Sequence, residues 1–282
     1  MNGPAGAVSP PSAPVLLAPD QWRAIDFISD LHLHAGEPDT MRAWQHYLQT
    51  TRADAVFILG DLFDVWVGDD CLLDTSDGGP SAFGFEQQCA QSLRTASQRL
   101  ALFFLHGNRD FLIGNAFAAA CCVTLLAEPT VLVFADERYL LSHGDALCLD
   151  DTDYMQFRTM ARSDAWQRAF LDQSLADRQA LGQSIRAQSE EKKRRSSQYI
   201  DLRASAVKEW LLVNQSQTLI HGHTHKPAVH DLGAGLRRVV LSDWDARSAP
   251  PRTEVLRLRR EPAPGTATVS LQRIEATRAH LS

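Results

Sequence analysis

The chain has 282 residues, of which 44% are hydrophobic and 22% are charged, and it carries a net charge of −6. This is the composition of an ordinary globular protein, long enough to bury a large core. The acidic balance argues against a general nucleic-acid-binding protein, so no nucleic-acid partner is expected. Five cysteines without a C-x-x-C pair indicate reduced thiols in a cytosolic protein rather than a disulfide framework.

The two ends of the chain have little to bury. Residues 1–23 are rich in Pro, Ala and Gly and predict a disordered N-terminal extension, with neither the basic start nor the long apolar run of a secretory signal. Residues 261–282 are largely polar and predict a loosely ordered tail. No run of about 18 apolar residues occurs, so any contact with a membrane would be made from its surface.

Short apolar segments alternate with helical patterns. Strands are expected at 24–29, 55–59, 101–105, 130–134, 139–142, 218–220, 238–241 and 253–258. Helices are expected at 41–48 and 85–100. The segment 135–138 predicts a four-residue hairpin turn.

This alternation predicts a layered α/β or α+β fold over residues 24–260. Residues 151–212 interrupt the strand rhythm with helical sequence. We therefore expect a helical cap inserted over the site.

Five of the expected strands end in side chains that can bind a metal. In layered α/β sheets, ligands lie outside the carboxyl ends of the strands, so these side chains are expected to meet. They are Asp30, His32, Asp61, Asn108, His143, His223 and His225.

Three carboxylate or amide oxygens and four imidazoles form a mixed donor set without thiolate. Such a set suits Mn, Fe, Zn or Ni rather than structural zinc or a calcium cage. Seven ligands are too many for one ion, but they suit two ions that share a carboxylate, for which Asp61 is the natural choice. Two such ions can clamp a phosphoryl group and activate a water molecule.

The individual motifs differ in specificity. Asp-x-His and Gly-Asp-x-x-Asp are each compatible with an ordinary surface turn. The pattern from Gly222 to His225 is more specific, because sixteen glycines and ten histidines would produce it about 0.02 times by chance. All five motifs in order, each after a strand, favour a metal centre.

The ordered motifs Asp-x-His, Gly-Asp-x-x-Asp, Gly-Asn-x-Asp, His-Gly-Asp and Gly-His-x-His resemble the signature of the calcineurin-like metallophosphoesterases. This resemblance implies a β-sandwich flanked by helices and a pair of metal ions. By this resemblance, one metal is held by Asp30, His32, Asp61 and His225. The other is held by Asp61, Asn108, His143 and His223.

Arg109 narrows the expected substrate. Many phosphomonoesterases of this family carry His at this place, where it can protonate a leaving alkoxide. A leaving phosphate needs no proton, and Arg can grip its oxygens with two hydrogen bonds. Arg109 therefore favours cleavage of a P–O–P link; the alternative is that Arg109 only pairs with Asp110.

Longer strings around these ligands resemble a narrower family, the UDP-2,3-diacylglucosamine pyrophosphatases. They include 27–33, 60–70, 106–112, 142–148 and 220–227. The resemblance implies hydrolysis to lipid X and UMP in lipid A synthesis, with Mn²⁺ and hydroxide attack on the α-phosphate. It also implies a peripheral position on the cytoplasmic face of the inner membrane, with no obligate protein partner. The implied catalytic residues are Asp61, Asn108 and Arg109, and the implied substrate contacts are Asn108, Arg109, Asp151, Ser189, Lys193, Arg195 and His223.

The cap sequence offers two interpretations. An apolar stripe could line a site for acyl chains, or it could be ordinary helix core; it comprises Trp166, Phe170, Leu171 and Leu175. The basic run 192–195 could meet phosphate or anionic lipid, or it could be a solvated face. Two other functions also stay open, namely another phosphodiesterase of the same fold and a degenerate member that acts as a scaffold.

Overall fold

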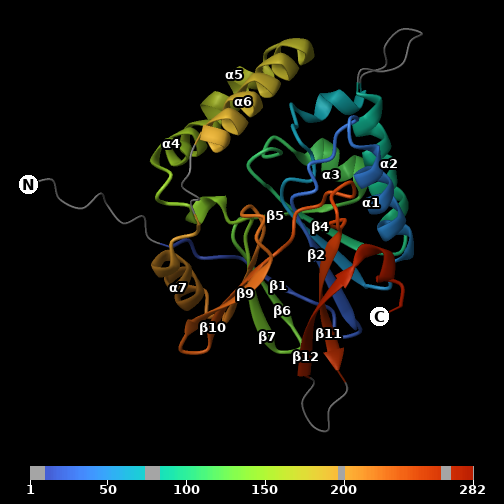
Figure 1. The fold of residues 1–282 in the computed structure, drawn as a ribbon, viewed down its shortest axis with the longest axis vertical. Coiled ribbons are helices and arrows are strands. Elements are labelled where there is room, and N and C mark those ends of the chain that lie inside the picture. The colour runs from blue at the N-terminus through green and yellow to red at the C-terminus, as the bar shows by residue number, and fades with distance from the viewer. Residues whose placement is uncertain (1–9, 74–82, 196–200, 262–267, 282) are drawn as a thin grey trace, which may run out of the picture.

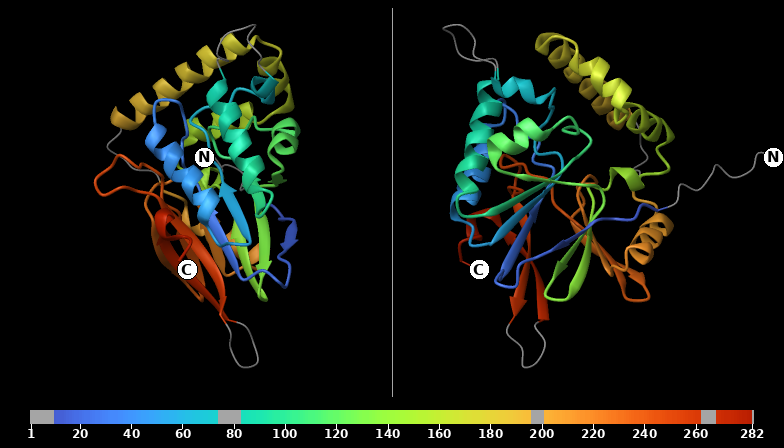
Figure 2. Two further views of the ribbon diagram at one scale, coloured as in Figure 1. Left: turned by 90° about the vertical axis from the view of Figure 1, so that its right-hand side faces the viewer. Right: turned by 180° about the vertical axis from the view of Figure 1, so that it is seen from behind.

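The structure is a computed structural model that describes residues 10–73, 83–195, 201–261 and 268–281, without the side chains of residues 189, 190 and 192–195. Two six-stranded sheets pack face to face, with helices on both outer faces and a helical arm beside one end (Figures 1 and 2). This layered arrangement confirms the predicted fold class.

The first sheet has the order β12-β11-β2-β3-β4-β5. The strands β2 to β5 run parallel, and β11 and β12 add antiparallel strands at one side. Their bounds are β2 (Ala24–Ile28), β3 (Ala55–Leu59), β4 (Ala101–Leu105), β5 (Thr124–Leu126), β11 (Glu254–Glu261) and β12 (Thr268–Glu275).

The second sheet has the order β1-β6-β7-β8-β10-β9. Its central strands β7 and β8 are parallel, so their carboxyl ends leave the sheet at the same edge. The bounds are β1 (Val15–Leu17), β6 (Thr130–Phe134), β7 (Glu137–Leu141), β8 (Thr218–His221), β9 (Ala228–Gly233) and β10 (Leu236–Val240).

Alternating side chains of the strands build separate cores. Phe27 and Phe57 face the second sheet and fill the interior of the sandwich, whereas Ile28 and Val56 face the outer helices. The helices over the first sheet are α1 (Pro38–Thr50), α2 (Gly84–Ala96) and α3 (Asn115–Cys121), and α7 (Ala204–Val213) covers the second. Short 3₁₀ helices are η1 (Asp69–Leu73), η2 (Asp145–Leu147) and η3 (Ala276–Arg278).

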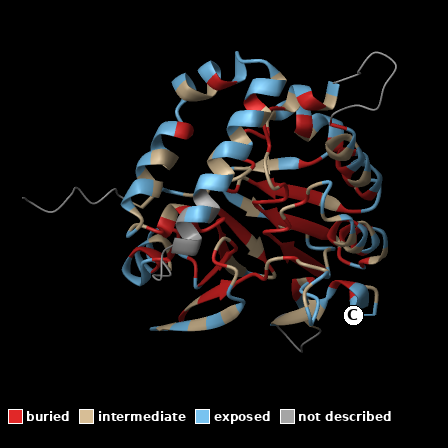
Figure 3. Ribbon diagram, turned by 45° about the horizontal axis from the view of Figure 1, so that its top comes forward, coloured by how far each residue is buried: buried red, intermediate tan, exposed pale blue. Residues whose placement is uncertain are grey.

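Three consecutive helices form the helical arm. They are α4 (Thr152–Ala161), α5 (Asp164–Leu171) and α6 (Leu175–Arg195). Figure 3 shows that most of the described surface of α6 is exposed, in contrast to the strands below it. Across the described ranges, no helix is long and apolar enough to cross a membrane.

The structure corrects several sequence predictions. Within the predicted disordered extension, residues 15–17 form β1, which pairs in parallel with β6; residues 1–9 lie outside the described residues. The expected loose tail contains β12, which pairs with β11 along its whole length. The hairpin between β6 and β7 turns on two residues rather than four, since Ala135 and Asp136 both adopt positive φ. Helix α7, expected in the cap, packs on the second sheet instead.

Candidate metal centre

All seven expected metal ligands follow the carboxyl ends of strands, and these ends lie at one edge of the sandwich. Asp30 and His32 follow β2, Asp61 follows β3, and Asn108 follows β4. His143 follows β7 in the second sheet. His223 and His225 follow β8.

The backbone at this edge is strained. Five of the seven residues have φ between 48° and 65°, a left-handed conformation that residues other than glycine rarely adopt. They are Asp30, His32, Asp61, His223 and His225. Strain of this kind costs of order 1–3 kcal/mol per residue and gathers at functional sites. The fold therefore fixes the direction of these side chains at a cost in stability.

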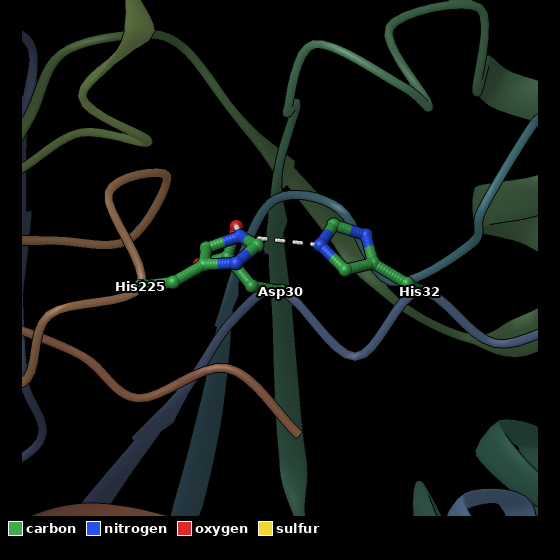
Figure 4. Close-up of side chains that lie close together, drawn as sticks. All are labelled: Asp30, His32 and His225. Carbon is green, nitrogen blue, oxygen red and sulfur yellow. Dashed lines mark hydrogen bonds and ion pairs between the residues drawn. The ribbon is translucent and has the colours of Figure 1, made fainter. Parts of the chain in front are cut away.

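The first group of side chains comprises Asp30, His32 and His225 (Figure 4). The Nε2 atoms of His32 and His225 lie 3.2 Å apart, and His225 Nε2 lies 3.2 Å from Oδ1 of Asp30. The other oxygen of Asp30 accepts hydrogen bonds from the Ser29 hydroxyl and from the backbone N–H of His223. One carboxylate oxygen thus faces the two imidazoles while the other is held in place.

The second group is centred on Asp61. Its Oδ2 atom lies 3.9 Å from Nδ1 of His32 and 3.7 Å from Nε2 of His143. The Oδ1 atom of Asn108 lies 3.0 Å from His143 Nε2 and 2.9 Å from His223 Nδ1. Asp61 therefore lies between His32 of the first group and His143 of the second.

Two glycines allow the strand ends to approach so closely. A Cβ atom on Gly60, where φ is +88°, would lie 2.6 Å from the backbone of Gly107 and from His143 Nδ1. A Cβ atom on Gly107 would lie 2.0 Å from Oδ1 of Asp61. Any larger residue would separate the loops that carry Asp61, Asn108 and His143.

The electrostatics of the centre favour cations. Burial acts to raise the pKa of Asp30, but His225, His143 and His32 hold it well below its ordinary value of 3.8. Burial also acts to lower the pKa of His143, yet the charges of Asp61 and Asp30 raise it to about 9. The carboxylates thus stabilise positive charge in the centre. A divalent ion bound there would compete with the proton on His143.

The residues present fit a pair of divalent metal ions. Two sets can each bring their donor atoms within 4.8 Å of one another: Asp30 with His32 and His225, and Asp30 with Asp61 and His143. Burial, followed by the charge of Arg109, lowers the pKa of His32 well below 6.5, so its imidazole is neutral, as a metal ligand must be. In the part of the chain that is described, the buried Nδ1 atom of His32 has no hydrogen-bond partner.

Arg109 does not pair with Asp110. Its Nη1 atom lies 2.7 Å from Asp64, its Nε atom lies 3.5 Å from Asp61, and its backbone N–H donates to Asp61. Asp110 instead accepts N–H groups of Gly107, Asp61 and Leu62, while burial raises its pKa to about 7. The alternative in which Arg109 only pairs with its neighbour is therefore wrong.

A second layer of side chains supports the ligands and was not predicted from the sequence. Glu128 accepts the Ser142 hydroxyl and the His143 N–H at 2.8 and 2.9 Å. Arg158 from α4 joins Glu128 to the fully buried Asp145, at 2.8 Å to each carboxylate. Asp145 lies in the His-Gly-Asp motif, so the sequence offered a clue to its role. No local sequence pattern distinguishes Glu128 or Arg158.

The structure places only some of the arm residues that were predicted to contact the substrate or its acyl chains. Asp151 accepts the N–H of Tyr154 and begins α4 as its N-cap. Phe170 is 4% exposed and belongs to the core between the first sheet and its outer helices. For this residue the interpretation as ordinary core is therefore correct. Trp166 and Leu175 pack against that core, whereas Leu171 is 41% exposed. Ser189, Lys193, Arg195 and the rest of the basic run have side chains outside the described part of the structure.

The chain is similar to known proteins over most of its length. Residues 24–227 match the family model of the calcineurin-like phosphoesterases. A UDP-2,3-diacylglucosamine hydrolase of Chromohalobacter salexigens is 42% identical over 224 residues, which cover 77% of this chain and 87% of that protein. A protein of the same name from Aromatoleum aromaticum is 44% identical over 224 residues, with coverage of 77% and 88%. The chain therefore belongs to the calcineurin-like phosphoesterases, in the branch formed by the UDP-2,3-diacylglucosamine hydrolases.

Proposed function

We propose that this protein hydrolyses the pyrophosphate bond of UDP-2,3-diacylglucosamine, with UMP and 2,3-diacylglucosamine 1-phosphate (lipid X) as products in lipid A synthesis. The observation that carries the proposal is the sequence identity of 42–44% to two hydrolases of that name over 87–88% of their length. The convergence of seven metal-binding side chains at one sheet edge supports the hydrolytic chemistry.

We assign the two metal positions by the order of the motifs. One is held by Asp30, His32, Asp61 and His225, and the other by Asp61, Asn108, His143 and His223. Bound divalent ions supply the positive charge and the activated water that phosphoryl chemistry needs. We propose Mn²⁺ for both positions on the resemblance to the UDP-2,3-diacylglucosamine pyrophosphatases; the mixed oxygen and imidazole donor set without thiolate is compatible with it.

Arg109 holds the phosphates of the substrate in this proposal. Its side chain lies between Asp61 and Asp64 and is 16% exposed, so its guanidinium can reach an anion that enters the centre. A guanidinium can bind two phosphate oxygens at once and stabilise the charge that develops on them. Asn108 and His223 contact the same phosphates from the metal side.

The helical arm receives the acylated sugar. Asp151, Ser189, Lys193 and Arg195 are proposed contacts there. Met160, Leu171 and Leu181, one on each arm helix, are 50%, 41% and 40% exposed, so each leaves apolar surface that acyl chains or lipid could contact. We propose that the protein works as a peripheral protein at the cytoplasmic face of the inner membrane.

The direct test is release of UMP from UDP-2,3-diacylglucosamine in detergent micelles. We expect release with Mn²⁺ and loss of release after chelation, restored by adding Mn²⁺ back. ADP-ribose and cyclic nucleotides serve as competing substrates under the same conditions. Faster hydrolysis of either would replace the proposed function with that of another phosphodiesterase, and a protein that binds no metal would favour a scaffold.

A further inference from the structure

Arg178 lies in the first turn of α6, and its side chain is only 2% exposed. Its Nη1 atom donates to the carbonyl of Val67 at 2.6 Å and to Asp70 Oδ1 at 2.9 Å. Its Nη2 atom donates to the other oxygen of Asp70, and its Nε atom donates to the carbonyl of Gln173 at 3.1 Å. One buried guanidinium therefore joins the helical arm to the segment 67–70.

The segment 67–70, to which Arg178 is hydrogen-bonded, is itself bonded to the start of α3. Asp69 accepts the backbone N–H groups of Gly114 and Phe117 at the start of α3, at 3.0 and 2.8 Å. The indole N–H of Trp66 also donates to Asp69, and its ring packs 5.1 Å from that of Phe117. Arg178 thus ties the arm to a segment that is itself hydrogen-bonded to the start of α3.

The chain that leads to segment 67–70 begins at the metal centre. Asp61 stands at its start, and Asp64 pairs with Arg109 on one side and with Arg186 of α6 on the other. The residues 61–70 therefore link the candidate shared metal ligand, the phosphate-binding arginine and two points of the arm. Within ten residues, the chain runs from the candidate centre to its contacts with α6.

The arm and the residues 65–70 are closely packed where they meet, a contact that we call the joint. Gly68 has φ of +129°, and a Cβ atom there would lie 2.4 Å from Arg178 Nη1 and 2.8 Å from Leu171 Cδ2. A Cβ atom on Gly182 would lie 2.8 Å from Val65. The arm is thus pressed onto the segment at two places along α6.

We infer that Arg178, through its paired hydrogen bonds to Asp70 and its bond to Val67, is a positioning residue that holds the arm beside the metal centre for a large substrate. The inference rests on the proposed function, in which the arm receives the acylated sugar. A held arm is already oriented when the substrate arrives, so less ordering is left to binding. A small phosphodiester that occupies only the metal centre needs no contact with α6.

Three variants break the joint to different degrees. Arg178→Ala removes every bond, Arg178→Lys keeps a point charge but loses the planar fork, and Asp70→Asn leaves the bond to Val67. The expected order of effect is Arg178→Ala, then Arg178→Lys, then Asp70→Asn. Arg168→Ala, which changes an exposed arginine of the same arm, is the matched control.

The first measurement is amide hydrogen exchange. In Arg178→Ala, exchange over 175–188 should accelerate roughly tenfold, while exchange in β3 and β4 stays unchanged. The second measurement compares two substrates in Mn²⁺, UDP-2,3-diacylglucosamine and bis(p-nitrophenyl) phosphate. For the lipid substrate, kcat/KM should fall roughly tenfold or more, mainly through KM, and for the small diester it should stay within about twofold.

Two results would overturn the inference. Unchanged exchange in α6 would show that Arg178 does not hold the arm. An equal loss with both substrates would show that the substitution damages the metal centre instead. If the unaltered protein does not hydrolyse UDP-2,3-diacylglucosamine, the proposed function fails, whereas the exchange experiment still decides whether Arg178 holds the arm.

Discussion

The edge of the sandwich and the helical arm are built in opposite ways. At the edge, Asp30, Asp61 and His143 are at most 2% exposed and stand on strained backbone or beside glycines that touch the neighbouring loop. In the arm, the described part of α6 is largely exposed (Figure 3). The arm meets the rest of the molecule through particular side chains on all three helices, among them Phe170, Arg158 and Arg178.

This difference separates chemistry from substrate selection. Dense packing fixes the positions of the metal-binding side chains, because any shift would break several contacts at once. Few side chains in the described part of α6 are buried, so we expect local opening of α6 to cost less free energy than opening of the edge. We therefore expect substitutions at the edge to remove catalysis with every substrate, and substitutions in α6 to affect mainly the acylated one.

The largest effect is expected at the residue between the two metal groups. Asp61→Ala should lower hydrolysis of both the lipid substrate and bis(p-nitrophenyl) phosphate by roughly 10³-fold or more, because both metal positions lose a ligand. Bound metal, measured by elemental analysis, should fall as well. Near-normal activity of Asp61→Ala would show that Asp61 is not shared by the two metal positions. It would also weaken the contrast in substrate dependence between the edge and the arm.

The next effect concerns stability within the sandwich. Asp26 and Arg257 are both fully buried and are joined at 2.7 Å, with Tyr47 and Thr51 bonded to the same carboxylate. Asp26→Ala leaves the charge of Arg257 buried without its partner, which should cost about 3–5 kcal/mol in the free energy of unfolding.

Thermal or urea unfolding measures this change, with Asp172→Ala on the exposed end of α5 as the control. By contrast, Arg178→Ala in the arm should change global unfolding much less. Equal losses of global stability in both variants would mean that the arm and the sandwich unfold as one unit.

Arg109→Ala should have an intermediate effect on activity. Loss of a charged hydrogen-bond donor to phosphate is worth about 1.5–3 kcal/mol, or roughly 10–150-fold in kcat/KM. Steady-state kinetics with UDP-2,3-diacylglucosamine measure the loss, and unfolding experiments measure stability in parallel. A variant that loses stability in proportion to its activity would show that Arg109 serves only its pairs with Asp64 and Asp61.

The smallest expected effect is a loosening of the arm at low pH. The hydrogen bond from Arg178 holds the pKa of Asp70 below its ordinary value of 3.8, so the pair stabilises the arm at pH values above about 4. As pH falls through the lowered pKa, Asp70 becomes protonated and this contribution is lost. Limited proteolysis by pepsin should therefore reach α6 progressively more readily as the pH is lowered below about 4, and Asp70→Asn should remove much of that dependence.

The sequence located the regular parts of the fold well. The strands β3 and β4 begin and end where they were predicted, because five consecutive apolar residues bounded by turns give a clear signal. The strands β1 and β5 were missed, since three residues are too short for a pattern. The strand β12 was missed because its polar composition, suited to a sheet edge, resembles that of a loop.

The sequence by itself determined the donor set of the candidate centre and its order along the chain, because each donor directly follows a strand. Only the tertiary structure decided that Arg109 pairs with Asp64 rather than Asp110, and that Arg178 joins the arm to Asp70 across 108 residues. Contacts of this kind connect segments that come together only when the sheets and helices pack. No local periodicity marks them, so they cannot be predicted from a single sequence.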